Sequence, residues 1–264
     1  MNRDEIRSKI AKGITIALPI VLVAILAMLV VVAMDISGDD GSVPVINNGG
    51  GESTSTTTDK KDEEPVPDPS SEGLSFISNG DGTCALDGRG ECGDTFIIVP
   101  TMSPDGDIVV EIADGAFKNS NAIRGLELPS TLKSIGAYAF YGAAIKDIFI
   151  PSSVGEIGNY ALSGCKYLEK IEVDEGNKTY SSLSGALYSK DGKTLITYPA
   201  GKSENFVNIS RDVTKISNMA FYRCSSIKKV NYHGTSASWK SVEIGAGNEV
   251  IDEAFIYCAG DSSK

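Results

Sequence analysis

An internal repeat with a step of 22 residues is the feature that most limits what this chain can fold into. The related segments are ELPSTLKSIGAYAF (127–140), FIPSSVGEIGNYAL (149–162) and, less closely, NISRDVTKISNMAF (208–221). Ile135 and Ile157, at equal positions of the first two segments, are 22 residues apart. A unit this short cannot bury its own apolar side, so successive units must stack on one another. The repeat therefore predicts a solenoid.

Each unit contains a triplet that is typical of a short strand and is apolar-polar-apolar, except that Phe149 takes the middle position in one of them. The five triplets are Leu126–Leu128, Ile148–Ile150, Ile171–Val173, Val207–Ile209 and Val230–Tyr232. Because side chains alternate along a strand, the outer residues of each triplet should point inward and the middle one outward. A second apolar set follows three of the triplets, as in Ile135, Ala139 and Phe140. Its spacing suits a short helical or 3-10 turn whose aromatic ring fills the interior of the coil.

The segment IGAYAFYGAAIKDIFIPSSVGEIGNYALSGCKYLEKI (135–171) resembles the BspA-type leucine-rich repeat. That pattern is roughly Ile-Gly-x-x-Ala-Phe-x-x-Cys-x-x-Leu-x-x-Ile-x-Ile-Pro. Three other stretches resemble segments that accompany these repeats: SFISNGDGTCALDGRGECGDTFIIVP, NKTYSSLSGALYSKDGKTLITYP and VNYHGTSASWKSVEIGAGNEVI. Leu162 stands where the pattern has Phe, and Ala143–Ala144 stand at a Cys position, but both keep small or apolar groups in the coil.

The resemblance covers about residues 74–258 and implies a fold class, an α/β-type repeat solenoid. Its leucine-rich repeats are expected to have short parallel strands joined by short helical or 3-10 turns. The domain is expected to span residues 74–260. The resemblance also implies display on a surface, that of a bacterial cell.

One unit departs from the repeat. Ile157 and Ile216 occupy equal positions but are 59 residues apart, which is well above two repeats. Residues 174–206 are therefore expected to hold an atypical unit with a hairpin near Ser189–Lys193, where the sequence KDGK favours a tight turn. This unit should interrupt the row of strands.

The N-terminal part predicts a membrane anchor. Residues 14–34 form a run of 21 residues without a charge, long enough to span the hydrocarbon core of a bilayer as a helix. Basic residues precede the run and acidic residues follow it, which places residues 1–13 in the cytoplasm and the C-terminal domain outside. A cleaved signal peptide is the alternative. The run exceeds the usual length of a signal peptide's apolar region, which favours an uncleaved signal anchor.

A polar linker separates the anchor from the repeats. Residues 35–73 are rich in Gly, Ser, Thr, Pro and acidic side chains and contain no aromatic residue. Such a segment cannot bury enough apolar surface to offset its conformational entropy, so we expect it to be disordered. Its simplest role is a stalk that holds the repeat domain away from the membrane.

The five cysteines fall into three groups. Cys165 and Cys224 share one repeat position, where a small buried side chain is expected, and their separation of 59 residues argues against a bridge. Cys84 and Cys92 flank a Gly-rich turn, so they form either a disulfide or two packed thiols. Cys258 is left over.

Several classes of function are disfavoured. The formal net charge of −11 and the lack of a basic cluster in the repeats argue against binding of nucleic acid. His233 is the only histidine, and no Cys-x-x-Cys pair is present, so neither a metal site nor a cofactor is expected. We find no spacing typical of a nucleophile elbow or a phosphate-binding loop. No catalytic residue is therefore assigned.

The expected function is recognition or adhesion, by binding of an extracellular protein or glycan. In a solenoid the outward residues of stacked strands form one surface that is available to a ligand. The candidate binding face consists of the middle residues of the triplets, Glu127, Phe149, Glu172, Asn208 and Asn231. Two other functions stay open: a structural spacer of the cell envelope and, less favoured, a hydrolase acting on glycans or the cell wall.

Overall fold

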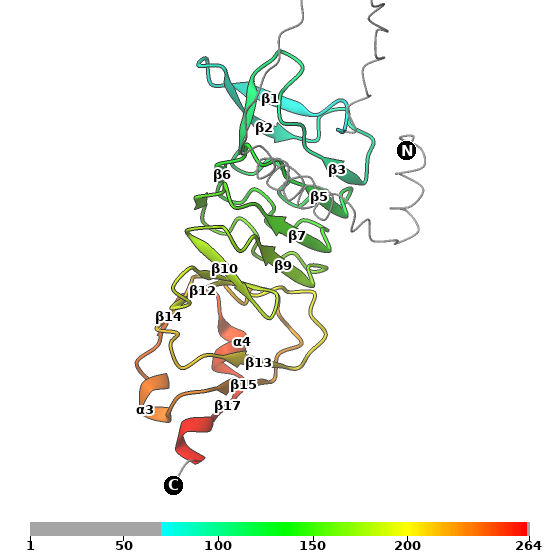
Figure 1. Ribbon diagram of the computed structural model, residues 1–264. Coiled ribbons are helices and arrows are strands. Elements are labelled where there is room, and N and C mark those ends of the chain that lie inside the picture. The colour runs from blue at the N-terminus through cyan, green and yellow to red at the C-terminus, as the bar shows by residue number, and fades with distance from the viewer. Residues whose placement is uncertain (1–69, 263–264) are drawn as a thin grey trace, which may run out of the picture. The chain divides into compact units, whose positions relative to one another are not determined.

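The apolar-polar-apolar triplets form one strand in each coil of a solenoid (Figure 1). The computed structural model describes residues 70–262. The strands of this set are β3 (Phe96–Ile98), β5 (Gly125–Glu127), β7 (Asp147–Ile150), β9 (Lys170–Val173), β13 (Phe206–Ile209), β15 (Lys229–Tyr232) and β17 (Phe255–Cys258). They pair in parallel as β3–β5, β7–β9 and β13–β15–β17. The five predicted strands are confirmed, each within one residue of its expected bounds.

A second set of strands, which the repeat pattern did not predict, runs along another side of the coils. Its parallel members are β2 (Thr83–Gly88), β4 (Ile108–Ile112), β6 (Ser134–Ile135), β8 (Glu156–Ile157), β12 (Thr194–Thr197), β14 (Lys215–Ile216) and β16 (Glu243–Ile244). They form two separate ladders, β2–β4–β6–β8 and β12–β14–β16. The isoleucines expected to open a helical turn, such as Ile135, lie instead in these short strands.

The turns that follow the second strands are not helical, and the expected helical or 3-10 turns are a wrong prediction. Alternate amides donate to the next coil, whereas the amides between them, such as those of Ala139 and Tyr141, donate within their own turn. We number the coils 1 to 6 by their turns, which contain in order Phe117, Phe140, Leu162, Tyr198, Phe221 and Asn248. In coil 2, Tyr138, Phe140 and Gly142 donate to the carbonyls of Asn159, Ala161 and Ser163, with N···O distances of 2.9, 2.8 and 3.0 Å. Tyr138 also has a positive φ of 57°, which ends a right-handed turn. We call this set of bonds between turns the turn ladder.

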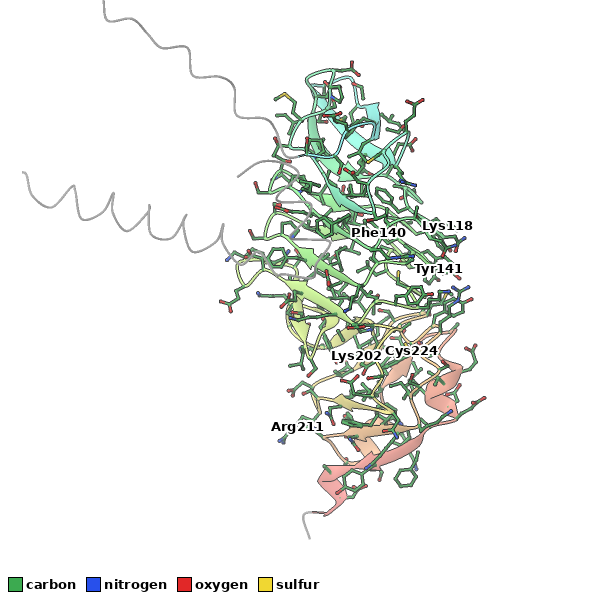
Figure 2. The ribbon with its side chains drawn as sticks, turned by 90° about the vertical axis from the view of Figure 1, so that its right-hand side faces the viewer. Lys118, Phe140, Tyr141, Lys202, Arg211 and Cys224 are labelled. Atoms are coloured by element: carbon green, nitrogen blue, oxygen red, sulfur yellow. The ribbon has the colours of Figure 1, made fainter. Side chains whose placement is uncertain are left out.

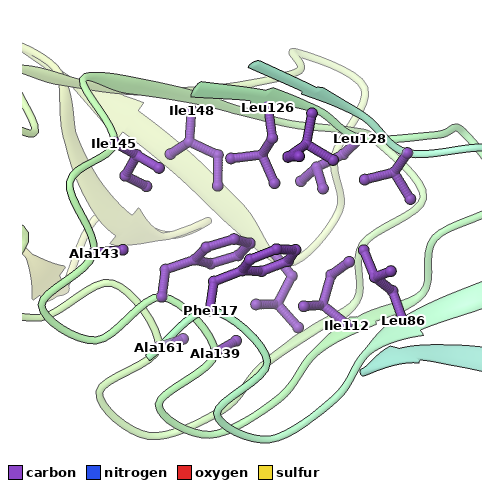
Figure 3. Packing of buried hydrophobic residues seen from close by; sticks show 14 of the residues in the cluster. Leu86, Ile112, Phe117, Leu126, Leu128, Ala139, Ala143, Ile145, Ile148 and Ala161 are labelled. Atoms are coloured by element: carbon purple, nitrogen blue, oxygen red, sulfur yellow. The ribbon is translucent and has the colours of Figure 1, made fainter. Parts of the chain in front are cut away.

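The interior of the coils is filled by residues from both sets of strands and from the turns. The rings of Phe117 and Phe140 stack at 5.4 Å with an interplanar angle of 3°. Figure 3 shows Phe117 between Leu126 and Ile148 on one side and Ala139 on the other. The alternation predicted for the strands is confirmed, because Ile148 and Ile150 are buried whereas Phe149 is 44% exposed.

The atypical unit contains two hairpins. β10 (Tyr180–Leu183) pairs antiparallel with β11 (Ala186–Ser189), and β11 pairs antiparallel with β12. The predicted turn near Ser189–Lys193 joins β11 to β12. The turn at Ser184–Gly185 was not foreseen; both residues have positive φ, 51° and 78°, as in a two-residue type I′ turn.

Strand β11 divides the interior into two apolar clusters. Leu187 belongs to the cluster of the N-terminal coils, whereas its neighbours Ala186 and Tyr188 belong to the cluster of the C-terminal coils. All three side chains are buried. Because successive side chains of a strand point to opposite faces, this one strand serves both clusters.

Short elements complete the described part of the chain. β1 (Ser75–Ser78) pairs antiparallel with β2 at the N-terminal end, and α3 (Ser236–Trp239), α4 (Glu249–Asp252) and the 3-10 helix η1 (Ala259–Ser262) lie in the C-terminal part. Ser71, expected in the linker, is buried and hydrogen-bonds to Ile98.

The anchor predicted at residues 14–34 lies outside the described residues, as do residues 1–13 and 35–69 of the cytoplasmic segment and linker. Between residues 70 and 262, no helix combines the length and the apolar character needed to cross a bilayer.

Candidate binding surface

The outward side chains of β3, β5, β7, β9, β13, β15 and β17 form two parallel rows, which we call the strand face. The first row is Phe96, Gly125, Asp147, Lys170, Phe206, Lys229 and Phe255. The second row is Ile98, Glu127, Phe149, Glu172, Asn208, Asn231 and Tyr257. All five residues predicted for the binding face lie in the second row. The pattern of triplets missed the first row because those residues precede the triplets.

The middle of the strand face is charged around one exposed aromatic ring. Lys170 and Glu172 on β9 form an ion pair at 2.6 Å. Phe149 pairs with Glu172 across the β7–β9 ladder. Because this phenyl ring is 44% exposed, it is available to a ligand.

The C-terminal end of the strand face is aromatic. Phe206, Phe255 and Tyr257 are 40%, 67% and 41% exposed, which is far more than an aromatic ring in a core shows. The ammonium group of Lys229 lies 4.9 Å from the centre of the Tyr257 ring. Beside them, the Asn231 amide donates to the Asn208 amide oxygen at 3.1 Å. Of this aromatic patch (Phe206, Phe255 and Tyr257 with Lys229), sequence reasoning found none. Phe206 and Lys229 precede the triplets, and Phe255 and Tyr257 lie on β17, which has no triplet of the repeat pattern.

A recess separates the two halves of the strand face at the atypical unit. It has a volume of about 560 Å³ and lies between Glu169–Lys170, the Ser184–Gly185 turn and residues 201–204. The Lys202 ammonium donates to the Ser184 carbonyl at 3.0 Å, and it lies 3.6 Å from the Glu204 carboxylate. These contacts hold the turn against the loop. The expected interruption of the row is thus a polar recess.

A second group of aromatic side chains lies along the turn ladder, away from the strand face. The Tyr141 and Tyr222 rings stack at 5.8 Å, and the Lys118 ammonium lies 5.8 Å from the Tyr141 ring. Figure 2 shows Lys118 and Tyr141 at one edge of the molecule. The hydrogen bond between the two phenols raises the pKa of Tyr141, and that bond together with Arg223 lowers the pKa of Tyr222.

The cysteines are free thiols. Cys165 and Cys224 are buried, as predicted, and burial raises the pKa of each to about 12. Of the two alternatives for Cys84 and Cys92, the structure has the packed thiols rather than the disulfide. Within residues 70–262, no cluster of three His, Cys, Asp or Glu side chains could hold a metal ion.

Comparison with solved structures finds bacterial leucine-rich repeat proteins. The pneumococcal vaccine antigen PcpA is 25% identical over 57% of this chain, with a TM-score of 0.49, and the match covers 35% of that antigen. A leucine-rich cell surface protein from Faecalibacterium prausnitzii is 18% identical, covers 74% of this chain and 75% of its own, and has a TM-score of 0.43. The T. pallidum leucine-rich repeat protein is 17% identical, covers 66% and 79%, and has a TM-score of 0.34.

The chain therefore spans about a third of the length of the pneumococcal antigen. The search of curated proteins finds no match. Because the TM-scores are all below 0.5, the family assignment rests on the repeats themselves. Residues 104–200 and 200–258, more than half of the chain, match the model of the BspA-type leucine-rich repeat region in six copies. The chain belongs to the BspA-type leucine-rich repeat family.

Proposed function

We propose that this protein is a non-enzymatic recognition or adhesion module that binds an extracellular protein through its strand face. The observation that carries the proposal is the aromatic patch, where three exposed rings stand on β13 and β17, the two strands that flank β15 in one hydrogen-bonded sheet. Exposed aromatic side chains on a rigid support are typical of the residues that contribute most to protein interfaces. A glycan could stack on the same rings, so it is the alternative ligand.

The rest of the proposal concerns where the domain acts. We infer that residues 14–34 anchor the chain in the membrane of a bacterial cell as a single span, with the repeats outside. The apolar run, its basic and acidic flanks and the polar linker support this inference. The linker would give the strand face reach beyond the membrane surface.

The test compares the full chain with a variant carrying Phe206→Ser, Phe255→Ser and Tyr257→Ser. Both are incubated with arrays of extracellular-matrix proteins and of glycans, and binding is measured by surface plasmon resonance. We expect saturable binding of the unchanged chain to a protein and at least a tenfold loss in the variant, as for a group of interfacial anchors.

A matched control removes exposed apolar side chains elsewhere. Ile77 and Leu183, 51% and 54% exposed, lie outside the strand face, so Ile77→Ser with Leu183→Ser should leave binding unchanged. An equal loss in the control would show non-specific apolar adhesion. Turnover of a glycan would favour a hydrolase, and absence of any ligand would favour a structural spacer.

A further inference from the structure

The turn ladder follows one rule in the N-terminal coils: alternate amides of one turn donate to alternate carbonyls of the next. Coil 1 donates from Gly115, Phe117 and Asn119 to Ala137, Ala139 and Tyr141 at 2.9, 2.7 and 2.7 Å. Coil 2 repeats the arrangement toward coil 3. Each turn therefore binds the main chain of its neighbour, which is itself a run of tight turns in which Ala139 and Tyr141 donate to the carbonyls of Gly136 and Tyr138.

The ladder stops after coil 3. The amides of Tyr160 and Leu162 occupy the donor positions, yet no carbonyl within residues 70–262 accepts from them. The reason is the short turn of coil 4, in which Leu195 and Val207 are 12 residues apart, against 14 for Ile157 and Ile171. The Tyr198 amide donates onward to Ala220 at 2.8 Å, away from coil 3.

A cavity of about 320 Å³ lies where the missing carbonyls would be. One wall is residues 157–163, and the opposite side is formed by Thr197, Lys215, Ser217 and Asn218. Ile157, expected in the core, is only partly buried because this cavity opens beside it. The volume is at the lower end of the range for ligand sites.

Besides the two free amide donors, the cavity contains a hydrogen-bond acceptor, the side-chain oxygen of Asn159. At the equal position of coil 1, the Asp114 carboxylate accepts a hydrogen bond from the Ala137 amide, while the Ala137 carbonyl accepts from Gly115 at 2.9 Å. Coil 5 repeats this arrangement, with Asn218 accepting from the Ala246 amide at 3.0 Å and Met219 donating to the Ala246 carbonyl at 2.7 Å. In both cases one alanine of the next coil is thus bound through both its amide and its carbonyl.

In coil 3 the same side-chain acceptor and backbone donor are present, at Asn159 and Tyr160, but no residue of coil 4 bonds to them. Asn159 lines the cavity, and within the described part of the chain its side chain has no hydrogen-bond partner. Together Asn159 and the amides of Tyr160 and Leu162 form one acceptor and two donors in the arrangement that elsewhere binds the turn of the next coil.

The ladder also shows which peptide would fit. The residue before each held alanine is glycine. A Cβ on Gly245 would lie 2.4 Å from the side-chain oxygen of Asn218 and 2.5 Å from its backbone nitrogen. Gly136 has an equally close contact, 2.6 Å, with the Asp114 amide nitrogen. Contacts this short exclude any side chain at that position.

We propose that the cavity between coils 3 and 4 is a second binding site, separate from the strand face, for a peptide with a Gly-small sequence that adopts the turn conformation of a neighbouring coil. The small residue donates its amide to Asn159 and accepts from the Tyr160 amide. Two residues later, either the carbonyl, as at Ala139, or an asparagine side-chain oxygen, as at Asn248, accepts from Leu162. The partner is a protein with such a segment at an exposed terminus or loop.

The probe is the capped peptide IGAGNE, the sequence of residues 244–249, which occupies the equal position on coil 5. Binding to the full chain is followed by fluorescence anisotropy, and hydrogen exchange is measured for the segment 158–164. We expect saturable binding and slower exchange at Tyr160 and Leu162. Asn159→Ala should weaken binding about fivefold, as for the loss of one hydrogen bond.

Two controls distinguish this site from general adhesion of the peptide. Asn159→Asp should bind about as well as the unchanged chain, because Asp114 performs the same function in coil 1. The peptide IVAGNE, in which valine replaces the glycine, should not bind. Melting temperatures show whether each variant folds. The proposal is overturned if the peptide does not slow exchange at 158–164, if Asn159→Ala binds equally well, or if IVAGNE binds like IGAGNE.

Discussion

Tyrosine occupies a left-handed backbone position in two successive turns, at Tyr138 and Tyr160, with φ of 57° and 60°. Glycine fills the equal position in coils 1 and 6, as Gly115 and Gly247. A side chain there costs about 1–3 kcal/mol of strain, so the rings must offset it. They do so by contact, because the Tyr138 and Tyr160 rings lie 5.1 Å apart.

Truncation of Phe140 and of Phe149 to alanine should change the stability of the domain by very different amounts. Phe140 is fully buried, so Phe140→Ala should destabilise the domain by about 3–5 kcal/mol. Phe149 is 44% exposed, so Phe149→Ala should change stability by less than about 1 kcal/mol. Denaturant unfolding measures both. A similar loss in the two variants would mean that Phe149 is packed and that the strand face is misassigned.

The cysteines should differ in their reactivity toward iodoacetamide at pH 8. Burial raises the pKa of Cys165 and Cys224 to about 12, so their reactive thiolates are scarce until the pH approaches that value. Cys258 is partly exposed and should be modified first. Mass spectrometry of the labelled chain identifies the sites, and unfolding in guanidinium should make all five equally reactive. Rapid labelling of Cys165 in the folded chain would contradict this packing.

At the scale of elements, the turn between β10 and β11 offers a simple gain in stability. Ser184 has a φ of 51°, a conformation that asparagine adopts more readily than serine. We expect Ser184→Asn to stabilise the domain by up to about 1 kcal/mol. Thermal unfolding measures the effect. Ser182→Asn, on the extended strand β10, is the control and should give no gain.

Truncation of a single side chain of β11 should destabilise only the apolar cluster into which that side chain packs. Leu187→Ala removes a buried side chain from the N-terminal cluster, and Tyr188→Ala removes one from the C-terminal cluster. Hydrogen exchange should therefore accelerate mainly in coils 1–3 for the first variant and in coils 5 and 6 for the second. Equal acceleration throughout the chain for both variants would show that the two clusters unfold as one.

The strands of the repeat could be predicted from the sequence. The turns could not, because their conformation depends on hydrogen bonds between coils. Ile171 and Val230 alternate with polar residues, so their direction follows from the local pattern alone. The segment from Ile135 to Phe140 has helical spacing, yet the amides of Tyr138 and Phe140 donate to the next coil, which no single unit reveals. For the same reason the cavity beside Asn159 depends on the length of a distant turn.

At the scale of the whole molecule, protease added to intact cells should release the repeat domain. The polar linker is the expected cleavage region, and the fragment should begin within residues 37–69 because Ser71 is held against β3. N-terminal sequencing of the released fragment is the measurement. A domain found only inside the cell, or one in the medium that begins near Asp35 without protease, would contradict the anchor.

The two-sided packing of β11 has a consequence for how this gene can change. Recombination between tandem copies adds or deletes whole coils, and each event is tolerated only if the contacts at the join survive. Because Leu187 closes one cluster while Ala186 and Tyr188 close the other, a coil gained or lost on one side leaves the packing on the other side untouched. The two arms of the solenoid can therefore vary in length independently, each carrying its own half of the strand face.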